Sequence, residues 1–317
     1  MQDLTAFANR LKKTAKHRRG WAQRSQVEAY RLYDFDIPEH RYIVDRFADH
    51  AVVYDKRGTQ EKDDPTTEAA LLQITADSLG IPLNHVHLKQ RRKAQEKHLG
   101  AGQGSSAIKI VVQEESSRYL VDMTHDLDTG LPLDHRPLRS RFRQLQPGLK
   151  FLNLFAKSGS ASIAASASGA TTVSVDISDA NIAWATENFK LNNLTLASHR
   201  LVRTDVLKFL ESGPTEKANF DVIFLDSPNF SNSQKMAQSF DLKRDHRRLL
   251  GWAMKFLSPQ GVLYFSTSRQ HFALDDALFN TFEVKAITLD TIPEDFRDQT
   301  IHQCFTLRLK PEGSTAE

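Results

Sequence analysis

The stretch that decides the fold runs from Phe151-Leu-Asn-Leu-Phe155 to Thr172-Val-Ser-Val-Asp176. Both ends are short apolar strands, and between them lie a Gly/Ser-rich turn and a helix of small residues, 161–168. Two buried strands joined by a helix are typical of a βαβ unit, in which the strands are parallel and covered on both faces. The stretch therefore predicts an α/β fold built on a parallel sheet.

Strand and helix continue to alternate downstream of this unit. The further elements predicted by the pattern are strands at 200–205, 220–226 and 262–266, helices at 181–191 and 237–257, and two last strands at 282–289 and 301–309. The last two have no helix between them and can pair directly only as an antiparallel hairpin. Residues 129–311 are therefore expected to form one doubly wound sheet that ends in this hairpin.

The first 128 residues show a different pattern. Apolar residues at helical spacing, with cations on the other faces, predict a basic amphipathic helix over residues 1–28. Residues 29–128 contain short β-rich stretches around one helix, which Thr66 is expected to cap and Gly80 to end. We therefore expect a small α+β accessory domain before the sheet, and a disordered tail at 312–317.

The distribution of charge favours a polyanionic partner. The net charge is +3, yet residues 1–25 carry seven Lys and Arg against one Asp, and residues 89–97 carry five against one Glu. Clustered cations gain affinity for phosphates by releasing counterions. We therefore expect the accessory domain to bind RNA. From charge alone, a solvated face of an amphipathic helix explains such clusters equally well.

The composition excludes several classes of protein. There is no apolar run of about 18 residues that could span a membrane, and the first residues lack the apolar core of a secretory signal. The single cysteine, Cys304, excludes an internal disulfide and a multi-cysteine metal site. The twelve histidines show no metal-binding spacing. We therefore expect a cytoplasmic protein without a metal.

Acidic residues follow three successive strands of the predicted sheet, namely Asp176, Asp205 and Asp226. Ligands of doubly wound sheets bind at these carboxyl ends. The first turn, 156–160, has one glycine and matches the dinucleotide fingerprint poorly. We interpret Asp176 as an acceptor for ribose hydroxyls and Asp205 as a partner of an adenine amino group. Together with the terminal hairpin, these acids favour S-adenosylmethionine over NAD as the cofactor.

The segment Asp226-Ser-Pro-Asn-Phe230 is where a substrate base is expected. Pro228 makes the turn rigid, Asp226 can accept hydrogen bonds, and Phe230 offers a face on which an unstacked base can stack. We therefore expect these three residues to form the catalytic loop. The alternative is that Asp226 caps a loop and Phe230 belongs to the core.

Several strings of residues resemble one family of RNA-modifying enzymes. They are Phe151-Leu-Asn-Leu-Phe155, Ser158-Gly-Ser-Ala161, Val175-Asp-Ile-Ser178, Ser227-Pro-Asn-Phe-Ser-Asn-Ser233, Phe240-Asp-Leu-Lys-Arg-Asp-His246, Leu127-Asp-Thr-Gly-Leu-Pro-Leu-Asp-His-Arg136 and Ile301-His-Gln-Cys304. They are similar to the C-terminal half of the bifunctional bacterial 23S rRNA guanine methyltransferase, the half that makes 7-methylguanosine. The resemblance covers nearly the whole chain.

This resemblance implies a Rossmann-like class I methyltransferase fold and a set of residues for S-adenosylmethionine. The residues implied for the methionine end of the cofactor are Asp134, Arg136, Asn153, Phe155, Ser158, Gly159 and Ser160, with Asp226 beside them. Those implied for the ribose are Asp176 and Ile177, and those for the adenine are Asp205 and Val206. The alternative for Arg136 is one more cation in a basic linker.

Two positions depart from the family pattern. Lys157 stands where the family has an aromatic residue, and Ser227 replaces the first proline of an Asp-Pro-Pro loop. Both lie in the loops expected to hold the cofactor and the base. They leave open whether the substrate or the activity differs from that of the family.

Guanine N7 carries a lone pair and no proton, so methyl transfer to it requires alignment and desolvation. We therefore expect no essential proton-transfer residue. Cys304, expected as a buried structural thiol, excludes the cysteine-dependent route to 5-methylcytosine.

Three other functions stay open. They are methylation of an exocyclic amine, a non-catalytic rRNA-binding or ribosome-assembly factor, and a small-molecule methyltransferase. The sequence also leaves open whether the RNA substrate is 23S rRNA or a large-subunit precursor. A further open point is whether a separate methyltransferase partner supplies the half of the fused enzyme that has no counterpart here.

Overall fold

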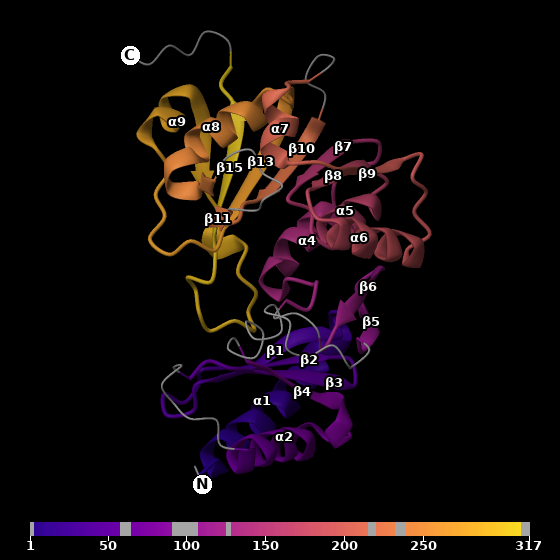
Figure 1. The fold of residues 1–317 in the computed structure, drawn as a ribbon, viewed down its shortest axis with the longest axis vertical. Helices are drawn as coiled ribbons and strands as arrows, with labels where there is room; N and C mark the ends of the chain where they lie inside the picture. Colours follow the sequence, from indigo (N-terminus) through magenta and orange to yellow (C-terminus); the bar gives the residue numbers. More distant parts are fainter. Residues whose placement is uncertain are drawn as a thin grey trace. The chain divides into compact units, whose positions relative to one another are not determined.

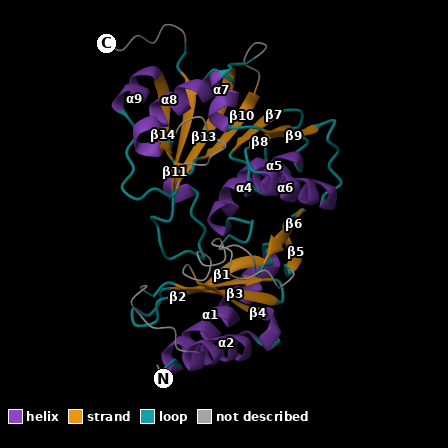
Figure 2. Cartoon of the chain, in the orientation of Figure 1, coloured by secondary structure: helices purple, strands orange, loops and turns teal. Residues whose placement is uncertain are grey.

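The computed structural model describes residues 3–57, 65–90, 107–124, 128–214, 220–231 and 239–311. The chain divides into two compact units. The first contains residues 1–133 and 294–298, and the second contains residues 134–293 and 299–317. Each unit has its own sheet and its own apolar core (Figures 1 and 2).

The first unit is an α+β domain. Its elements are α1 (Thr5–Arg24), β1 (Ala29–Asp34), β2 (Tyr42–Phe47), β3 (His50–Asp55), α2 (Pro65–Leu79), η1 (Leu83–His85), β4 (Val86–Gln90), β5 (Lys109–Glu114) and β6 (Ser117–Asp122). The sheet has the order β1-β2-β3-β4, and β4 is parallel to β3 because α2 crosses over between them. Helices α1 and α2 cover one face of this sheet (Figure 1). Helix α2 begins at Pro65, so Thr66 lies within it and is not its cap.

Helix α1 confirms the predicted basic amphipathic helix. It buries one face, made by Phe7, Leu11, Ala15 and Ala22. The ring of Phe7 packs edge-on against Tyr33 and Tyr42, with centroids 4.8 and 5.7 Å apart. Complete burial of such a side chain contributes about 1.5–3 kcal/mol. Packing of this face, with the cations left outside, therefore holds the helix on the sheet.

The second basic cluster of the sequence, 89–97, is described only at its first two residues. The side chain of Lys89 is buried, and its Nζ donates a hydrogen bond to the carbonyl oxygen of Asp122 at 3.0 Å. This cation therefore supports the fold of the first unit. Residues 91–97 and the glycine-rich stretch 100–104 lie outside the described residues, as does the tail at 312–317.

Residues 294–298 belong to the first unit although their neighbours on both sides belong to the second. The backbone N–H of Arg31 donates to Asp295 at 2.8 Å, and the Arg31 guanidinium lies over the Phe296 ring, 4.0 Å from its centroid. The carboxylate of Asp34 accepts two backbone N–H groups of the segment, at 3.0 and 3.3 Å. These buried polar contacts attach the segment to β1.

The second unit is a doubly wound α/β domain. Its elements are α4 (Arg136–Arg143), β7 (Lys150–Leu154), α5 (Ser160–Ser166), β8 (Thr171–Asp176), α6 (Asp179–Leu191), β9 (His199–Arg203), α7 (Val206–Glu211), β10 (Phe220–Asp226), β11 (Phe230–Ser231), β12 (Phe240–Asp241), α8 (Leu242–Met254), β13 (Leu257–Thr267), α9 (Asp276–Thr281), β14 (Phe282–Ala286), η3 (Thr288–Asp290) and β15 (Gln303–Leu309). The sheet order is β14-β15-β13-β10-β7-β8-β9. Strands β14 and β15 pair antiparallel, which confirms the predicted hairpin, and β15 also pairs antiparallel with β13.

Both faces of this sheet are buried, as the apolar strands require. Along β10, Ile223 and Leu225 join the core beneath α7 and α8, whereas Val222 and Phe224 join the core beneath α4 and α5. Side chains alternate between the faces of a strand, so each face receives every second residue. The sequence predicted this two-sided burial correctly.

One prediction about the helices of this unit is wrong. The helix expected at 237–257 begins only at Leu242, because Phe240 and Asp241 pair with β11 and Asp241 caps α8 by accepting the N–H of Lys243 at 2.8 Å. The alternative that placed Arg136 in a basic linker does not hold, because Arg136 begins helix α4, which buries Leu138 and Phe142. Its arginines obscured these two apolar positions, which lie four residues apart.

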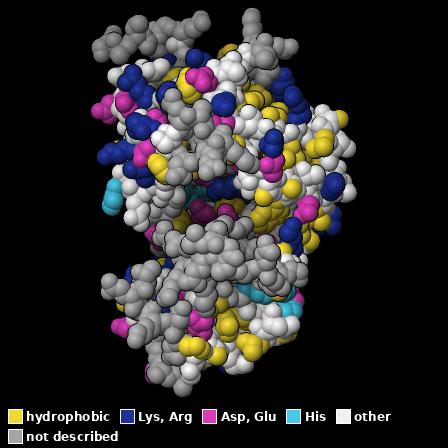
Figure 3. All heavy atoms as spheres, viewed as in Figure 1, with side chains coloured by type: hydrophobic (Ala, Val, Ile, Leu, Met, Phe, Trp, Pro, Cys, Tyr) yellow, Lys and Arg dark blue, Asp and Glu magenta, His cyan; other side chains and the backbone are white. Residues whose placement is uncertain are grey.

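Histidine side chains form a stack in the first unit. His50 stacks on His85 with ring centroids 4.0 Å apart, and its Nδ1 lies 3.0 Å from Nε2 of His87. Figure 3 shows histidines together on the visible face of this unit, over β3. Burial, helped by His50 and Lys89, lowers the pKa of His87 to about 4.

The free energy of unfolding of the first unit should fall as the pH falls from about 6.5 to about 4. In this window an unfolded histidine, with a pKa near 6.5, binds a proton that folded His87 does not. The unfolded state therefore gains protons, at a cost to stability of about 2–3 kcal/mol in total. Hydrogen exchange of the β3 and β4 amides, corrected for intrinsic rates, measures this. His87→Gln should flatten the pH dependence of the free energy of unfolding, and the exposed control His17→Gln should not. Equal pH profiles for the two variants would show that His87 is not the group responsible.

Among the described residues, no helix combines the length and the apolar character needed to cross a membrane.

Candidate functional site

Acidic side chains gather at one edge of the sheet of the second unit. Strands β10, β7, β8 and β9 are neighbours and run parallel, so their carboxyl ends share this edge (Figure 2). Asp176 and Asp226 are the last residues of β8 and β10. Asp205 follows β9 and is the N-cap of α7. The fold therefore brings the three acids singled out in the sequence to one edge.

The turn between β7 and α5 has an unusual backbone. Phe155, Lys157 and Gly159 all have positive φ, at 59°, 49° and 77°. For non-glycine residues such values are uncommon and concentrate at functional sites. At Gly159 a Cβ would lie 3.0 Å from Cε1 of Phe189 and 3.2 Å from Cβ of Ala185. This position therefore requires glycine both for its φ and for its space.

Asp176 ties this turn to the end of β8. Its Oδ2 accepts the N–H of Lys157 at 2.9 Å, while its Oδ1 accepts from the N–H of Ser178 at 2.9 Å and from Nδ2 of Asn181 at 3.1 Å. Each carboxylate oxygen has two lone pairs, so Oδ2 can accept one more hydrogen bond, as a ribose hydroxyl would supply. The next residue, Ile177, is half-buried.

Asp205 has the local role that its position suggests. Its Oδ1 accepts the N–H of Leu207 at 2.9 Å, which caps α7. The hydrogen bonds of the described residues leave Oδ2 without a partner within hydrogen-bonding distance, so this oxygen is the one that can meet a ligand. Val206 is 2% exposed and packs in the core between the sheet and α7.

Other residues of the turn are buried. Asn153 is 1% exposed, and its Nδ2 donates to Oγ of Ser162 at 3.0 Å, which places its amide beneath the turn. Ser158 is buried, and its carbonyl oxygen accepts from Nδ2 of Asn188 at 3.0 Å. Ser160 is the buried first residue of α5, and Phe155 is half-buried.

A hydrogen-bonded network holds Asp134. Nδ1 of His302 lies 3.0 Å from Oδ2 of Asp134, and Nε2 of the same ring lies 2.9 Å from Oγ1 of Thr291. Nε2 of His135 lies 2.9 Å from Oγ of Ser266. The 3-10 helix η2 (Leu133–His135), the segment before β15 and the end of β13 thus meet around one carboxylate. Arg136, the first residue of α4, is buried at 7% exposure.

The charges within this network differ from those of free side chains. Burial alone would raise the pKa of Asp134, but the neighbouring His135, the hydrogen bond from His302 and the charge of Lys157 outweigh that effect and hold it below its usual range. Burial lowers the pKa of the His135 imidazole. Asp134 is therefore an anion at neutral pH, and His135 is a neutral ring.

Lys157 closes the site on the side of Asp226. Its Nζ lies 3.1 Å from Oδ2 of Asp226, and Oδ1 of the same carboxylate lies 3.9 Å from Nε2 of His135. Lys157 thus pairs with the acid at the end of β10. Because Lys157 is half-exposed, the pair can open to solvent or to a ligand.

The loop after Asp226 presents an aromatic ring to solvent. Ser227 N–H donates to the carbonyl oxygen of Ser266 at 3.1 Å, and Oγ1 of Thr267 donates to Oδ1 of Asn229 at 3.2 Å, so the end of β13 holds the loop around Pro228. Phe230, in β11, is 55% exposed. The alternative in which Phe230 is a core residue is therefore wrong.

Three residues of the site were not singled out in the sequence: His135, Ser266 and His302. His135 and His302 lie in the strings 127–136 and 301–304, next to Asp134 and Ile301 respectively. Isolated histidines carry no spacing signal, and His135 and His302 lie 167 positions apart in the chain. Only the pairing of β15 with β13 brings them together.

Two groups of described residues place metal-binding atoms within 4.8 Å of one another. In the group Asp134, His135 and His302, protein hydrogen bonds engage the imidazole nitrogens nearest the carboxylate. In the group Asp49, His50 and His85, the two rings are stacked with 6° between their planes. A metal lies in the plane of each imidazole that binds it, so two parallel stacked rings cannot both point at one ion.

Comparison with known proteins places the chain in a family. A family model described as an S-adenosylmethionine-dependent methyltransferase matches residues 68–291. Ribosomal RNA large subunit methyltransferase K of Neisseria meningitidis is 37% identical over 314 residues, 98% of this chain and 89% of that protein. Ribosomal RNA large subunit methyltransferase K/L of Legionella pneumophila is 38% identical over 309 residues, 94% of this chain but 42% of that protein. The chain thus spans less than half the length of such K/L relatives.

Solved structures agree in fold. A structure described as a SAM-dependent methyltransferase from Streptococcus mutans has a TM-score of 0.77 at 21% identity, covering 98% of this chain and 82% of that one. A methyltransferase structure complexed with SAH has the same TM-score at 20% identity. The chain therefore belongs to the S-adenosylmethionine-dependent methyltransferases, in the family of ribosomal RNA large subunit methyltransferase K.

Proposed function

We propose that the protein methylates 23S rRNA and forms 7-methylguanosine by direct transfer to guanine N7. The observation that carries the proposal is an exposed aromatic ring, Phe230, in the loop that follows Asp226, one of the strand-end acids suited to an adenosyl cofactor. The K and K/L relatives, named as large-subunit rRNA methyltransferases, support an RNA substrate.

The residues at the sheet edge fit S-adenosylmethionine. Asp176 offers a free lone pair for a ribose hydroxyl, with Ile177 beside it, and Asp205 offers one carboxylate oxygen for the adenine amino group, with Val206 at its base. The turn 155–160 packs closely on α6 because Gly159 has no side chain, where a Cβ would meet Phe189 and Ala185. The anionic Asp134 and the adjacent Arg136 suit the amino and carboxylate groups of the methionine end.

When bound, the cofactor supplies a methyl group activated by a sulfonium. The residues of the chain then have to hold a base in line with it. Phe230 offers a stacking face, Pro228 fixes the loop, and Asp226 accepts a hydrogen bond from the base. Guanine N7 needs no deprotonation, so alignment and exclusion of water supply the rate.

The described site lacks a free base next to Phe230, which suits N7 better than an exocyclic amine. Asp226 is paired with Lys157 at 3.1 Å, and His135 is buried and bonded to Ser266. Methylation of an exocyclic amine requires a proton to leave during the reaction, and a paired carboxylate accepts it poorly. Single-turnover rates at saturating cofactor should therefore change less than about threefold between pH 6.5 and 8.5, whereas a general base would give a titration step.

The substrate class is tested by methyl transfer from labelled S-adenosylmethionine to purified RNAs. We expect label in 23S rRNA that lacks the modification, and none in 16S rRNA or tRNA. Naked 23S rRNA, large-subunit precursors and intact subunits are compared in parallel, with and without a second methyltransferase. Label confined to 16S rRNA or tRNA would overturn the proposed substrate, and cofactor binding measured separately shows whether the protein is active.

His302 is proposed to position Asp134 for the cofactor. His302→Gln keeps an amide near Thr291 but moves the donor away from Asp134, so the dissociation constant for S-adenosylmethionine should rise about tenfold, as for a lost hydrogen bond to a charged group. His302→Asn places its amide nitrogen near the position of Nδ1, so the dissociation constant for S-adenosylmethionine should rise less than about threefold. Isothermal titration calorimetry measures both. Equal weakening by the two variants would show that His302 acts only through the packing of the core.

A further inference from the structure

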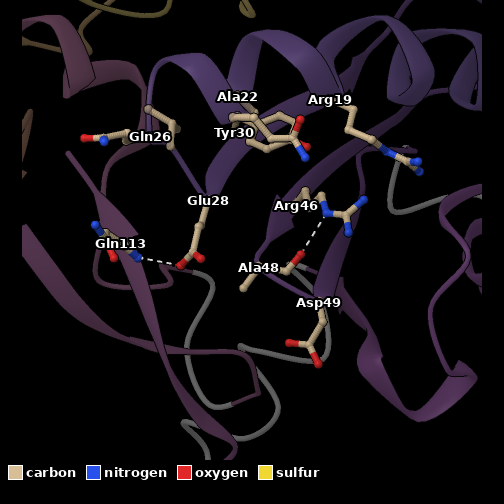
Figure 4. A pocket seen from close by; sticks show the side chains of 11 residues that line it. Arg19, Ala22, Gln26, Glu28, Tyr30, Arg46, Ala48, Asp49 and Gln113 are labelled. Atoms are coloured by element: carbon tan, nitrogen blue, oxygen red, sulfur yellow. Dashed lines mark hydrogen bonds between the residues drawn. The ribbon is translucent and has the colours of Figure 1, made fainter.

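The first unit contains a pocket of its own, lined only by residues of that unit. It is a cavity of about 690 Å³ between the end of α1, the edge of the sheet and β5 (Figure 4). Its charged lining residues are Arg19, Glu28, Arg46 and Asp49, and its neutral polar ones are Gln23, Gln26, Tyr30 and Gln113. Pockets that hold small ligands have volumes of about 300–1,000 Å³. The cavity is therefore large enough for one nucleotide.

One end of the pocket is cationic. Arg19 and Arg46 point into the same region in Figure 4. Nε of Arg46 donates to the carbonyl oxygen of Ala48 at 2.7 Å, which fixes the guanidinium and leaves its terminal nitrogens without a hydrogen bond to any described residue. Two arginines with free donors are the groups that recognise a phosphate.

Tyr30 forms part of the wall at this end. The ring is 5% exposed, and Trp21 packs edge-on against it with centroids 5.7 Å apart. Burial raises the pKa of Tyr30 against the opposing charges of Arg46, Arg19 and Arg18. The phenol therefore stays protonated and can donate a hydrogen bond beside the arginines.

The other end of the pocket carries a carboxylate. Glu28 is exposed, and its Oε2 accepts the backbone N–H of Gln113 at 2.8 Å, an interaction visible in Figure 4. This bond orients the carboxylate and leaves Oε1 available. The side-chain amides of Gln26 and Gln113 line the pocket beside it. An oriented carboxylate between amides recognises a group that presents N–H donors.

We propose that this pocket binds one unpaired RNA nucleotide, with its phosphate at Arg19 and Arg46 and a guanine edge at Glu28. Guanine presents two neighbouring N–H donors, N1–H and N2–H, on its Watson–Crick edge, whereas uracil presents one N–H between two carbonyl oxygens. That edge is accessible only in unpaired nucleotides, which proteins read in single-stranded RNA. The proposal rests on the proposed rRNA substrate and names a second contact with it.

The test measures the affinity of the full chain, with S-adenosylmethionine bound, for two fluorescent RNA octamers. One octamer contains only uridine, and the other has a single central guanosine. Wild type should prefer the guanosine octamer by about 5- to 100-fold, the discrimination of a good two-bond contact to a base. Glu28→Gln, which keeps the acceptor for the Gln113 N–H, should lose most of this preference and keep its affinity for the uridine octamer.

Arg46→Gln tests the phosphate end. It should weaken both octamers equally and reduce the slope of log affinity against log salt by about 0.7, as for one lost phosphate contact on a single strand. The matched control is Arg24→Gln, which removes an exposed cation of the same unit, at the end of α1 and outside the lining of the pocket. It should change both affinities less than about twofold.

Two results would overturn the proposal: equal weakening of both octamers by Glu28→Gln, or equal effects of Arg46→Gln and Arg24→Gln. Methyl transfer to rRNA is assayed on the same variants, so the two proposals can fail separately. A guanosine preference that depends on Glu28, in a protein that transfers no label, would keep the pocket and reject the proposed reaction. Normal methyl transfer to rRNA by a protein without the guanosine preference would keep the proposed reaction and reject the pocket.

Discussion

Replacing Phe230 with alanine should lower the single-turnover rate of methyl transfer to rRNA about 10- to 100-fold, because stacking on an aromatic ring contributes about 1–3 kcal/mol per base. The ring is 55% exposed, so its loss leaves no cavity in the core. The dissociation constant for S-adenosylmethionine should change less than about twofold. Rapid-quench assays give the rate, and calorimetry gives the cofactor affinity.

The matched control for this variant is Phe279→Ala. Phe279 is a phenylalanine of the same unit, in α9, and is 46% exposed. Its removal should leave both the rate and the cofactor affinity unchanged. Equal losses of rate and of cofactor affinity in Phe230→Ala would contradict a role in holding the base.

Gly159→Ala should weaken the binding of S-adenosylmethionine at least about 100-fold, a loss of the size expected when a preorganised site shifts by an ångström. The added Cβ would lie 3.0 Å from Phe189 and 3.2 Å from Ala185, at a φ of 77°. The turn between β7 and α5 must move to relieve these contacts. The same turn contains Lys157, whose backbone N–H donates a hydrogen bond to Asp176. Calorimetric titration and urea denaturation measure affinity and stability.

Gly213→Ala separates the effect of the left-handed backbone from that of the contacts made by the added Cβ. Gly213 has a φ of 70°, but no atom lies within 4 Å of the position of its Cβ. This control should lose about 1–2 kcal/mol of stability from the left-handed backbone alone and keep its cofactor affinity. If Gly159→Ala lost no more affinity than Gly213→Ala, the turn would not be part of the cofactor site.

The sheet of the second unit could be predicted because its strands are short, apolar and separated by helices. Parallel strands buried on both faces leave little choice of structure for stretches such as 151–155 and 220–226. The ends of helices were harder to predict. Leu242 begins α8 because Phe240 and Asp241 pair with β11, and no propensity within the segment 237–257 indicates that pairing.

The strand-end acids could be predicted for the same reason as the sheet, since their positions follow from the strands. The network around Asp134 could not, because it depends on contacts between distant parts of the chain. His302 reaches Asp134 only because β15 lies antiparallel beside β13, and Lys157 reaches Asp226 only because of a turn with positive φ. Such contacts have no local signature in a single sequence.

The segment 294–298 illustrates the same limit on a larger scale. Its residues read as part of the loop between the last two strands, yet they pack in the first unit. The contacts responsible are a carboxylate, Asp295, on the N–H of Arg31 and a ring, Phe296, under its guanidinium. Neither residue is part of an apolar pattern that would assign it to a core.

The most direct test of the central claim is the identity of the methylated nucleoside. Unmodified 23S rRNA is incubated with the protein and labelled S-adenosylmethionine, digested to nucleosides and analysed by liquid chromatography and mass spectrometry, with the Phe230→Ala variant as the control. The account predicts label in 7-methylguanosine, reduced in the variant. Label in N2-methylguanosine or in another nucleoside, or no label from a protein that binds the cofactor and the RNA, would contradict it.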